Sequence, residues 1–223
     1  KSVEDVSPLK VGSQVPDVTL RSMDGVQVAL RNLLERPTIM VFYRGGWCPY
    51  CNLQLSGLQA IEDDLKAMGF NILAVSPDLP EHLQSSLDKG SLSYTLLSDS
   101  DMNAARAFGI AFHVDDETIE TYKGFNIDIE AASGQKHHLL PVPAVFIIDR
   151  QGVVRFAYAN ADYKIRLSPD EVKAAAAAVN STAFQCAGWT TIGALMSRSD
   201  PHHASATTRT VYPLITIRTL CLN

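Results

Sequence analysis

The chain has 223 residues, of which 46% are hydrophobic, so it can bury one core of ordinary size. Its formal net charge of -5 makes nucleic acid and acidic membrane surfaces unsuitable partners. The apolar runs are too short to span a bilayer, and the first residues lack the apolar stretch of a signal peptide. We therefore expect a cytoplasmic protein, unless a leader has been removed ahead of Lys1.

The first half of the chain predicts a hairpin and then alternating strands and helices. Apolar residues alternate on both sides of a turn at residues 23–25, which indicates an N-terminal hairpin. A continuous apolar run at residues 38–43 is typical of a strand buried on both faces, and the spacing of apolar residues predicts a helix over 49–68. The elements expected next are a strand at 70–76, a helix at 80–89, a strand at 95–97 and a helix at 102–108.

The second half predicts an insertion, a second hairpin and a last helix. Residues 110–140 make a longer connection than usual, with a helix-like portion at 117–132, so we interpret them as an insertion. Two apolar runs within residues 144–158 meet at a Gln-Gly turn and predict a hairpin. Ser168 and the proline after it are typical of a helix start, and this helix is expected to continue to residue 179.

The order of these elements predicts an α/β fold with a central sheet and flanking helices. We expect one domain at residues 9–179 and a C-terminal extension of uncertain structure at residues 180–223, where no clear period is visible. Cys186 and Cys221 fall in that extension, and we assign them no role.

Cys48 and Cys51 are three positions apart where the buried strand is followed by the helix. A helix N-terminus favours a thiolate, the spacing allows a disulfide, and Arg44 adds positive charge. Such a pair could also be half of a zinc site or plain apolar packing. The other Cys and His residues are distant, so we favour redox chemistry without a metal or other cofactor, and we expect at least one of the two sulfurs to be open to solvent.

Three segments resemble a known family: residues 42–51 (Phe-Tyr-Arg-Gly-Gly-Trp-Cys-Pro-Tyr-Cys), residues 15–17 (Val-Pro-Asp) and residues 144–152. They are similar to the alkyl hydroperoxide reductase/thiol-specific antioxidant family, the peroxiredoxins and their relatives, over residues 9–179. The resemblance implies a thioredoxin-like, peroxiredoxin-type fold with a central mixed sheet, flanking helices and an N-terminal hairpin. It also implies an antioxidant, thiol-dependent peroxidase that reduces hydroperoxides through a Cys48/Cys51 dithiol–disulfide cycle.

The family signature Pro-x-x-x-Thr-x-x-Cys places Cys51 at the peroxidatic cysteine, Cys48 at the threonine and Arg44 at the proline. The peroxide-polarising arginine of the family falls at Pro143, so the hydroxyl and the guanidinium that hold the peroxide are both replaced. Pro143 instead resembles the cis-proline beside the thioredoxin active site. The candidates to replace the missing arginine are Arg44, Arg106 and Arg150.

Two other functions stay open. A thioredoxin-like thiol-disulfide oxidoreductase would attack protein disulfides through Cys48 and resolve with Cys51, the reverse of the signature assignment. A non-enzymatic redox-sensing module would use the disulfide only to change conformation. The expected partners are a hydroperoxide or protein disulfide and a thioredoxin-like or glutathione-type reductant, without nucleic acid or membrane, and a homodimer is an alternative to a monomer.

The predicted substrate pocket consists of Arg44, Trp47, Tyr50 and Pro143. Trp47 and Tyr50 flank the cysteines, although packing explains two such aromatic residues equally well. His137 and the histidine after it, at the end of the insertion, are a candidate proton carrier, whereas most such pairs are simply exposed to solvent.

Overall fold

The computed structural model describes residues 2–84 and 92–187, with side chains up to residue 181. Lys1–Asn180 group as one compact unit, and Ser181–Asn223 group separately. The predicted extension from residue 188 onward, including Cys221, lies outside the described residues, as does the predicted 80–89 helix beyond Gln84.

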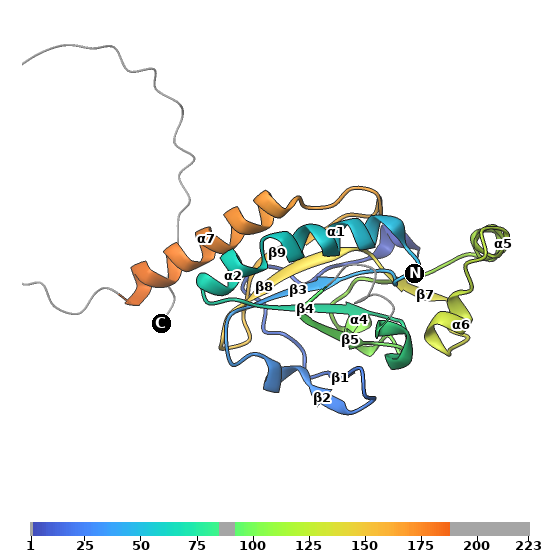
Figure 1. Ribbon diagram of the computed structural model, residues 1–223, viewed down its shortest axis with the longest axis horizontal. Coiled ribbons are helices and arrows are strands. Elements are labelled where there is room, and N and C mark those ends of the chain that lie inside the picture. Colours follow the sequence, from blue (N-terminus) through green and yellow to red (C-terminus); the bar gives the residue numbers. More distant parts are fainter. Residues whose placement is uncertain (1, 85–91, 188–223) are drawn as a thin grey trace, which may run out of the picture. The chain divides into compact units, whose positions relative to one another are not determined.

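A seven-stranded mixed sheet forms the centre of the first unit, in the order β2-β1-β5-β4-β3-β8-β9 (Figure 1). Its strands are β1 (Thr19–Arg21), β2 (Gln27–Ala29), β3 (Thr38–Phe42), β4 (Asn71–Ser76), β5 (Thr95–Ser98), β8 (Ala144–Ile148) and β9 (Val154–Ala159). β3, β4 and β5 are parallel, and β8 pairs antiparallel with β3. Both predicted hairpins, β1–β2 and β8–β9, are confirmed, and every residue of β3 and β8 is buried, as their unbroken apolar sequences indicate.

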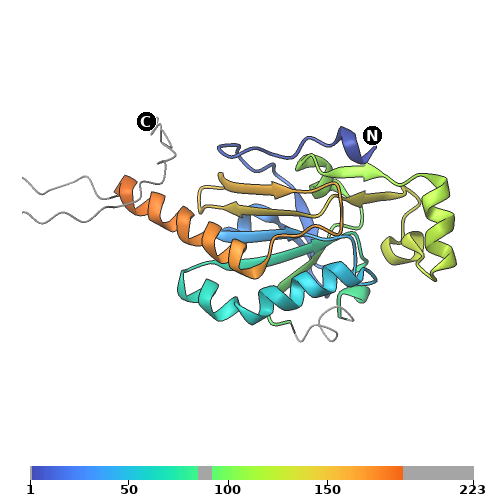
Figure 2. The same ribbon diagram turned by 90° about the horizontal axis from the view of Figure 1, so that it is seen from above.

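Helices cover both faces of this sheet. They are α1 (Pro49–Ala60), α2 (Glu62–Ala67), α4 (Asn103–Ala107) and α7 (Pro169–Ala187), together with the short 3-10 helices η1 (Val3–Asp5) and η2 (Leu30–Leu33). Side chains alternate between the faces along β3, so Ile39 and Val41 pack with α1, α2 and α7, whereas Met40 and Phe42 pack with α4. α1 and α7 lie across the same face (Figure 2).

The predicted helix at 49–68 is divided in two. Ile61 leaves the helical region, with φ of -113° and ψ of 9°. Its N–H donates to the carbonyls of Leu58 and Gln59, in the last turn of α1. The helix beginning at Ser168 is confirmed and extends past the predicted end at residue 179 to Ala187. α7 approaches α1 closely at its start, since a Cβ added at Gly57 would lie 2.9 Å from Pro169 Cγ.

The predicted insertion forms a separate lobe. It contains β6 (Ala111–His113), α5 (Asp116–Gly124), α6 (Ile129–Ser133) and β7 (Leu139–Pro141), and β6 and β7 pair antiparallel as a second sheet. Figure 1 shows α5 and α6 beyond the ends of the strands of the main sheet. A small core of Val114, Ile119, Ile129 and Leu140 holds the lobe, and Trp47 and Tyr122 pack against it. The insertion therefore reaches back to the loop that carries the cysteines.

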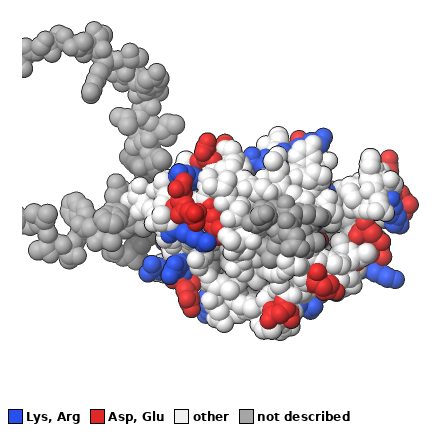
Figure 3. Space-filling model, viewed as in Figure 1, with Lys and Arg blue, Asp and Glu red and all other residues white. Residues whose placement is uncertain are grey.

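The surface carries charges of both signs. On the face seen in Figure 3, acidic and basic side chains lie next to one another in the coloured part of the chain. Among the helices that the structure describes, each is too short or too polar to cross a bilayer.

Candidate active site

The cysteine loop follows the carboxyl end of β3, at the predicted strand-to-helix junction. Cys48 is the N-cap of α1 and Pro49 its first residue. The Cys48 carbonyl accepts hydrogen bonds from the N–H groups of Cys51 and Asn52, both at 3.1 Å. Gly45 allows the loop to pass close to the Asp78 side chain before the helix begins. Its φ is +145°, and a Cβ added there would lie 2.8 Å from Asp78 Oδ1.

Both cysteines are free thiols and both are buried. The exposed fraction is 2% for Cys48 and 0% for Cys51. The expectation that one sulfur is open to solvent is therefore wrong for this state, because the apolar cluster between α1, α7 and the sheet includes both residues and Trp47 packs against it.

The two cysteines differ in ionisation. The neighbouring Cys51 side chain is the largest cause that shifts the pKa of Cys48, lowering it to about 6 despite its burial. The Cys51 N–H and the charges of Arg44 and Arg166 act in the same direction. Burial raises the pKa of Cys51 well above its ordinary value, and donation to Cys48 raises it further. The directions of the two shifts favour Cys48 over Cys51 as the thiolate of the pair.

Arg166 contacts the second sulfur directly. It lies between β9 and α7, and its Nη2 donates to Cys51 Sγ at 3.3 Å. Its Nη1 donates to Gln54 Oε1 at 2.8 Å, and its Nε to the Tyr163 carbonyl at 2.7 Å. Arg166 is not among the residues predicted from the sequence, because it is 115 positions from Cys51. The available signal was its place just before the last helix, which packs beside the helix that begins at the cysteines.

Arg44 is a buried cation enclosed by aromatic rings. Its exposed fraction is 3%, and its Cζ lies 5.3 Å, 5.4 Å and 4.3 Å from the ring centres of Trp47, Tyr122 and Tyr163. Its Nη2 donates to the Tyr122 hydroxyl, and its Nε has no hydrogen-bond partner within the described part of the chain. The guanidinium is thus held by cation–π contacts, and its charge stabilises the Cys48 thiolate.

The four predicted pocket residues lie around the cysteine loop without lining one cavity. Arg44 and Pro143 line a cavity of about 200 Å³, which the insertion closes with Phe112, Val114 and Tyr122. Trp47 lines a second cavity of about 260 Å³, together with Gly46 and Asp78. Tyr50 is 41% exposed and packs edge-on against Tyr163, with ring centres 5.6 Å apart.

The expected cis bond before Pro143 is wrong, because the described chain contains no cis peptide. The Val142 N–H donates a hydrogen bond to the Ile110 carbonyl. The peptide bond between Val142 and Pro143, just before β8, has the trans form that most X-Pro bonds adopt.

The other candidates engage groups away from the sulfurs. Arg106 donates to the Asp101 carbonyl at 2.8 Å, and Arg150 lines a cavity beside the β8–β9 turn. His137 Nε2 lies 2.9 Å from the Ser100 carbonyl oxygen, and burial lowers the pKa of His137. His138 pairs with Glu130 of α6. The structure therefore brings Arg44 and Arg166, but none of these residues, to the cysteines.

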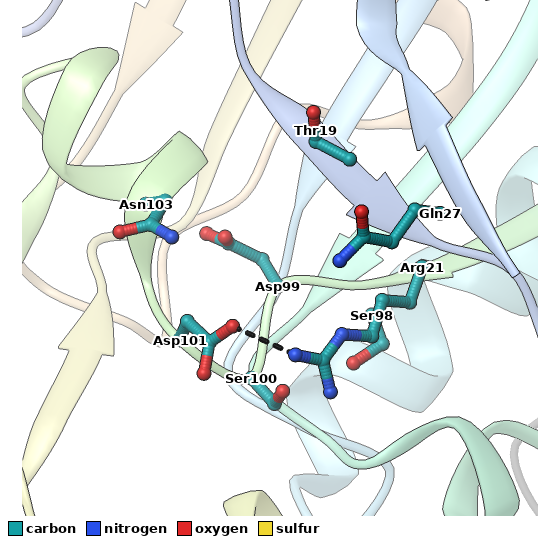
Figure 4. A pocket seen from close by; sticks show the side chains of 8 residues that line it. All are labelled: Thr19, Arg21, Gln27, Ser98, Asp99, Ser100, Asp101 and Asn103. Atoms are coloured by element: carbon teal, nitrogen blue, oxygen red, sulfur yellow. Dashed lines mark hydrogen bonds and ion pairs between the residues drawn. The ribbon is translucent and has the colours of Figure 1, made fainter. Parts of the chain in front are cut away.

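A small polar cavity of about 80 Å³ lies where β5 ends, two strands from the cysteine strand (Figure 4). Asp99 lines it and accepts hydrogen bonds from the N–H groups of Ala104 and Ala105 at 2.9 Å and 2.8 Å. Burial raises the pKa of Asp99 to about 6. Figure 4 also shows the ion pair of Arg21 with Asp101, at 3.0 Å. This cavity is separate from the cysteine site.

No group of three or more His, Cys, Asp or Glu side chains in residues 2–84 and 92–181 is arranged to hold a metal ion. Within that part of the chain, the functional groups around the sulfurs are the two guanidinium groups and the backbone N–H groups of the loop.

Comparison with known proteins agrees with this architecture. The AhpC/TSA family model matches residues 11–157. The chain is 36% identical to peroxiredoxin Bcp of Escherichia coli K12 over 105 residues, which are 47% of this chain and 67% of that protein. Reduced Prx3 of Vibrio vulnificus, solved with H2O2, has a TM-score of 0.62 at 21% identity, covering 75% of this chain and 99% of that one. Peroxidoxin BcpB of Mycobacterium tuberculosis has a TM-score of 0.60 at 19% identity, covering 78% and 97%.

Proposed function

The chain belongs to the AhpC/TSA family, and from this membership and the state of its two thiols we propose that it is a thiol-dependent peroxidase with a Cys48/Cys51 dithiol–disulfide cycle. The observation that carries the proposal is the place of Cys48 at the N-cap of α1, one turn before the fully buried Cys51, and the lowered pKa of Cys48 beside the raised pKa of Cys51 supports it. A dithiol–disulfide cycle uses one sulfur to attack the peroxide and the other to resolve the oxidised sulfur.

The directions of the two pKa shifts support an order of attack in which Cys48 reacts first. The Cys48 thiolate attacks the terminal oxygen of the hydroperoxide, the O–O bond breaks, and the alkoxide leaves as the alcohol after taking a proton. Cys48 becomes a sulfenic acid. Cys51 then loses its proton and attacks the Cys48 sulfur, the S–O bond breaks, and the hydroxide leaves as water. This order reverses the signature assignment, because Cys51 is the fully buried sulfur with the raised pKa.

A thioredoxin-like disulfide reductase is the second candidate, and one observation favours it. Cys48 is the N-cap of α1 and has a lowered pKa, as a disulfide-attacking cysteine requires. Its 2% exposure favours the peroxidase instead, because a small hydroperoxide reaches a buried sulfur more readily than a disulfide in a folded protein does.

We propose a thioredoxin-type protein as the reductant and a reducing compartment, the cytoplasm, as the location. Exposed apolar side chains near the pair support a protein partner. They lie on α1 and on the loop that carries Arg166, and they are Tyr50 (41% exposed), Leu53 (74%), Tyr163 (36%) and Ile165 (51%).

The test is peroxide consumption with thioredoxin or dithiothreitol, in a Cys186→Ser/Cys221→Ser background that leaves only the active pair. Cys48→Ser is expected to abolish consumption. Cys51→Ser, mixed with peroxide in the absence of an external thiol, is expected to consume one equivalent and stop at the Cys48 sulfenic acid. Catalytic consumption that survives Cys48→Ser would exclude the proposed cycle.

A further inference from the structure

We propose that the cavity which Arg44 shares with the insertion is a binding site for a small carboxylate with a compact apolar body, whose charge pairs with the Arg44 guanidinium. The cavity has a volume of about 200 Å³, and Arg44 forms part of its wall. The inference goes beyond the proposed function, because it concerns a ligand other than the peroxide and the reductant and is tested without either reaction.

Arg44 is a buried cation that lacks a carboxylate partner. Its exposed fraction is 3%, yet it makes no ion pair within the part of the chain that the structure describes. Its Nη2 donates to the Tyr122 hydroxyl, and its Nε has no hydrogen-bond partner among the described residues. A buried guanidinium with an unbonded donor carries a desolvation cost, which an anionic acceptor in the cavity would offset. The Arg44 side chain is therefore the group that a bound anion would satisfy.

The walls of the cavity determine what the rest of the ligand must be. The apolar side chains among the lining residues are Val3, Phe112, Val114, Pro143 and Ala161. The rings of Tyr122 and Tyr163 also line it, with their centres 5.4 Å and 4.3 Å from Arg44 Cζ. Burial of an apolar body against such walls is favourable. The volume is below the roughly 300–1,000 Å³ of pockets for drug-sized ligands, so the body must be compact.

The charges at the cavity favour a ligand with a single negative charge. Arg44 is the one cation among the lining residues, all of which the structure describes, and Asp115 at the same cavity is acidic. A dianion such as phosphate would keep one charge uncompensated beside apolar walls and would be repelled by Asp115. A carboxylate neutralises one guanidinium and accepts its N–H groups. Asp115 and Ala161 are exposed, which gives the ligand a way in from solvent.

The same guanidinium connects the cavity to the Cys48 sulfur. The Cys51 side chain and, to a smaller extent, the charge of Arg44 lower the pKa of Cys48. A carboxylate on Arg44 would therefore oppose the Cys48 thiolate, and the thiolate would oppose the carboxylate to the same degree, because coupling between two sites is reciprocal. When Cys48 is in a disulfide, its sulfur carries no charge and this opposition is absent. The oxidised protein should bind the carboxylate more tightly than the reduced protein.

The test measures binding of phenylacetate to the full chain by isothermal titration calorimetry. The neutral probe phenylacetamide keeps the ring and removes the charge, and inorganic phosphate is the dianionic probe. We expect phenylacetate to bind about tenfold more tightly than phenylacetamide, as for a charge-assisted hydrogen bond, and phosphate to bind more weakly than phenylacetate. In the Cys186→Ser/Cys221→Ser background, diamide oxidises only Cys48 and Cys51. Phenylacetate should then bind about fivefold more tightly than after reduction with dithiothreitol.

Two variants locate the site. Arg44→Met should abolish the preference for phenylacetate over phenylacetamide, whereas Arg155→Met, which removes an exposed arginine of β9, should keep it. Ala161→Trp leaves Arg44 in place and fills the cavity, so it should weaken binding of both probes even if Arg44→Met does not fold.

The assignment is overturned by the absence of saturable binding, by equal affinity for the two phenyl probes, by phosphate bound as tightly as phenylacetate, or by an affinity that Ala161→Trp leaves unchanged. Equal affinity of the disulfide and dithiol forms for phenylacetate overturns the coupling to Cys48. Because every readout is binding, none of these results depends on whether the protein reduces peroxide.

Discussion

Asp78 Oδ2 accepts a hydrogen bond from the Gly46 N–H at 2.8 Å, which ties the cysteine loop to the end of β4. The same oxygen accepts from Ser76 Oγ at 3.0 Å, and the exposed fraction of Asp78 is 1%. A buried carboxylate is thus the anchor for the segment that presents Cys48.

Removal of this anchor should loosen the loop. We expect Asp78→Ala to lower the free energy of unfolding by about 1–3 kcal/mol, since it removes the buried hydrogen bonds that Asp78 Oδ2 accepts from the Gly46 N–H and from Ser76 Oγ. Alkylation of Cys48 should become faster as the sulfur gains exposure. Asp78→Asn, which keeps an acceptor oxygen, should lose less stability. Thermal unfolding and iodoacetamide kinetics measure both effects, and equal losses in the two variants would contradict the prediction.

The reactivity of Cys48 should follow the ionisation of its sulfur. Because the pKa of Cys48 is lowered to about 6, the thiolate is present above that pH, and the alkylation rate should rise to half of its plateau near pH 6. Cys51→Ala removes the donating thiol and should move this midpoint upward. Cys51→Ser keeps a donor and should move it less. The pH dependence of iodoacetamide labelling in the Cys186→Ser/Cys221→Ser background gives the midpoints, and a midpoint unchanged in Cys51→Ala would refute the assigned hydrogen bond.

Arg44 should act on the same midpoint through its charge. Arg44→Met removes the guanidinium and keeps an apolar chain among the rings of Trp47 and Tyr122, so the alkylation midpoint of Cys48 should shift upward. Tyr122→Phe is the matched control, because it keeps the ring and removes only the hydroxyl that Arg44 donates to. A shift of the same size in both variants would mean that the contact with the Tyr122 hydroxyl, and not the charge of Arg44 alone, sets the ionisation of Cys48.

Local sequence signals predicted the parts of the fold that depend on neighbours in the chain. The hairpins, the buried strand β3 and the helix start after Cys48 were all predictable from apolar spacing and turn residues. The placement of Arg166 on Cys51 was not, because it depends on how α7 docks against α1. The ionisation order of Cys48 and Cys51 was also beyond the sequence, since it follows from burial and one hydrogen bond.

Gly45 tests the steric requirement of the cysteine loop. Gly45→Ala should lower both stability and peroxidase activity, because the residue has a φ of +145° and its new Cβ would lie 2.8 Å from Asp78 Oδ1 and from Trp47 Cδ1. Gly12→Ala is the control: its φ is +90° and nothing lies within 4 Å of its added Cβ, so it bears the conformational cost of roughly 1–2 kcal/mol alone. A loss in Gly45→Ala no larger than in Gly12→Ala would show that the loop tolerates the added methyl group.

Asp99 should make the stability of the protein depend on pH. Burial raises its pKa to about 6, so the folded state binds its proton more tightly than the unfolded chain does. Its contribution to stability is therefore fully present below the unfolded value near pH 4, is lost as pH rises toward 6, and is constant above that. The loss is on the order of 1–3 kcal/mol.

Asp99→Asn keeps an oxygen for the N–H groups of Ala104 and Ala105 but cannot titrate. The free energy of unfolding of this variant should therefore fall less between pH 4.5 and pH 7 than that of the wild type. Urea unfolding at the two pH values measures the difference, and identical slopes in the two proteins would show that Asp99 does not carry this proton.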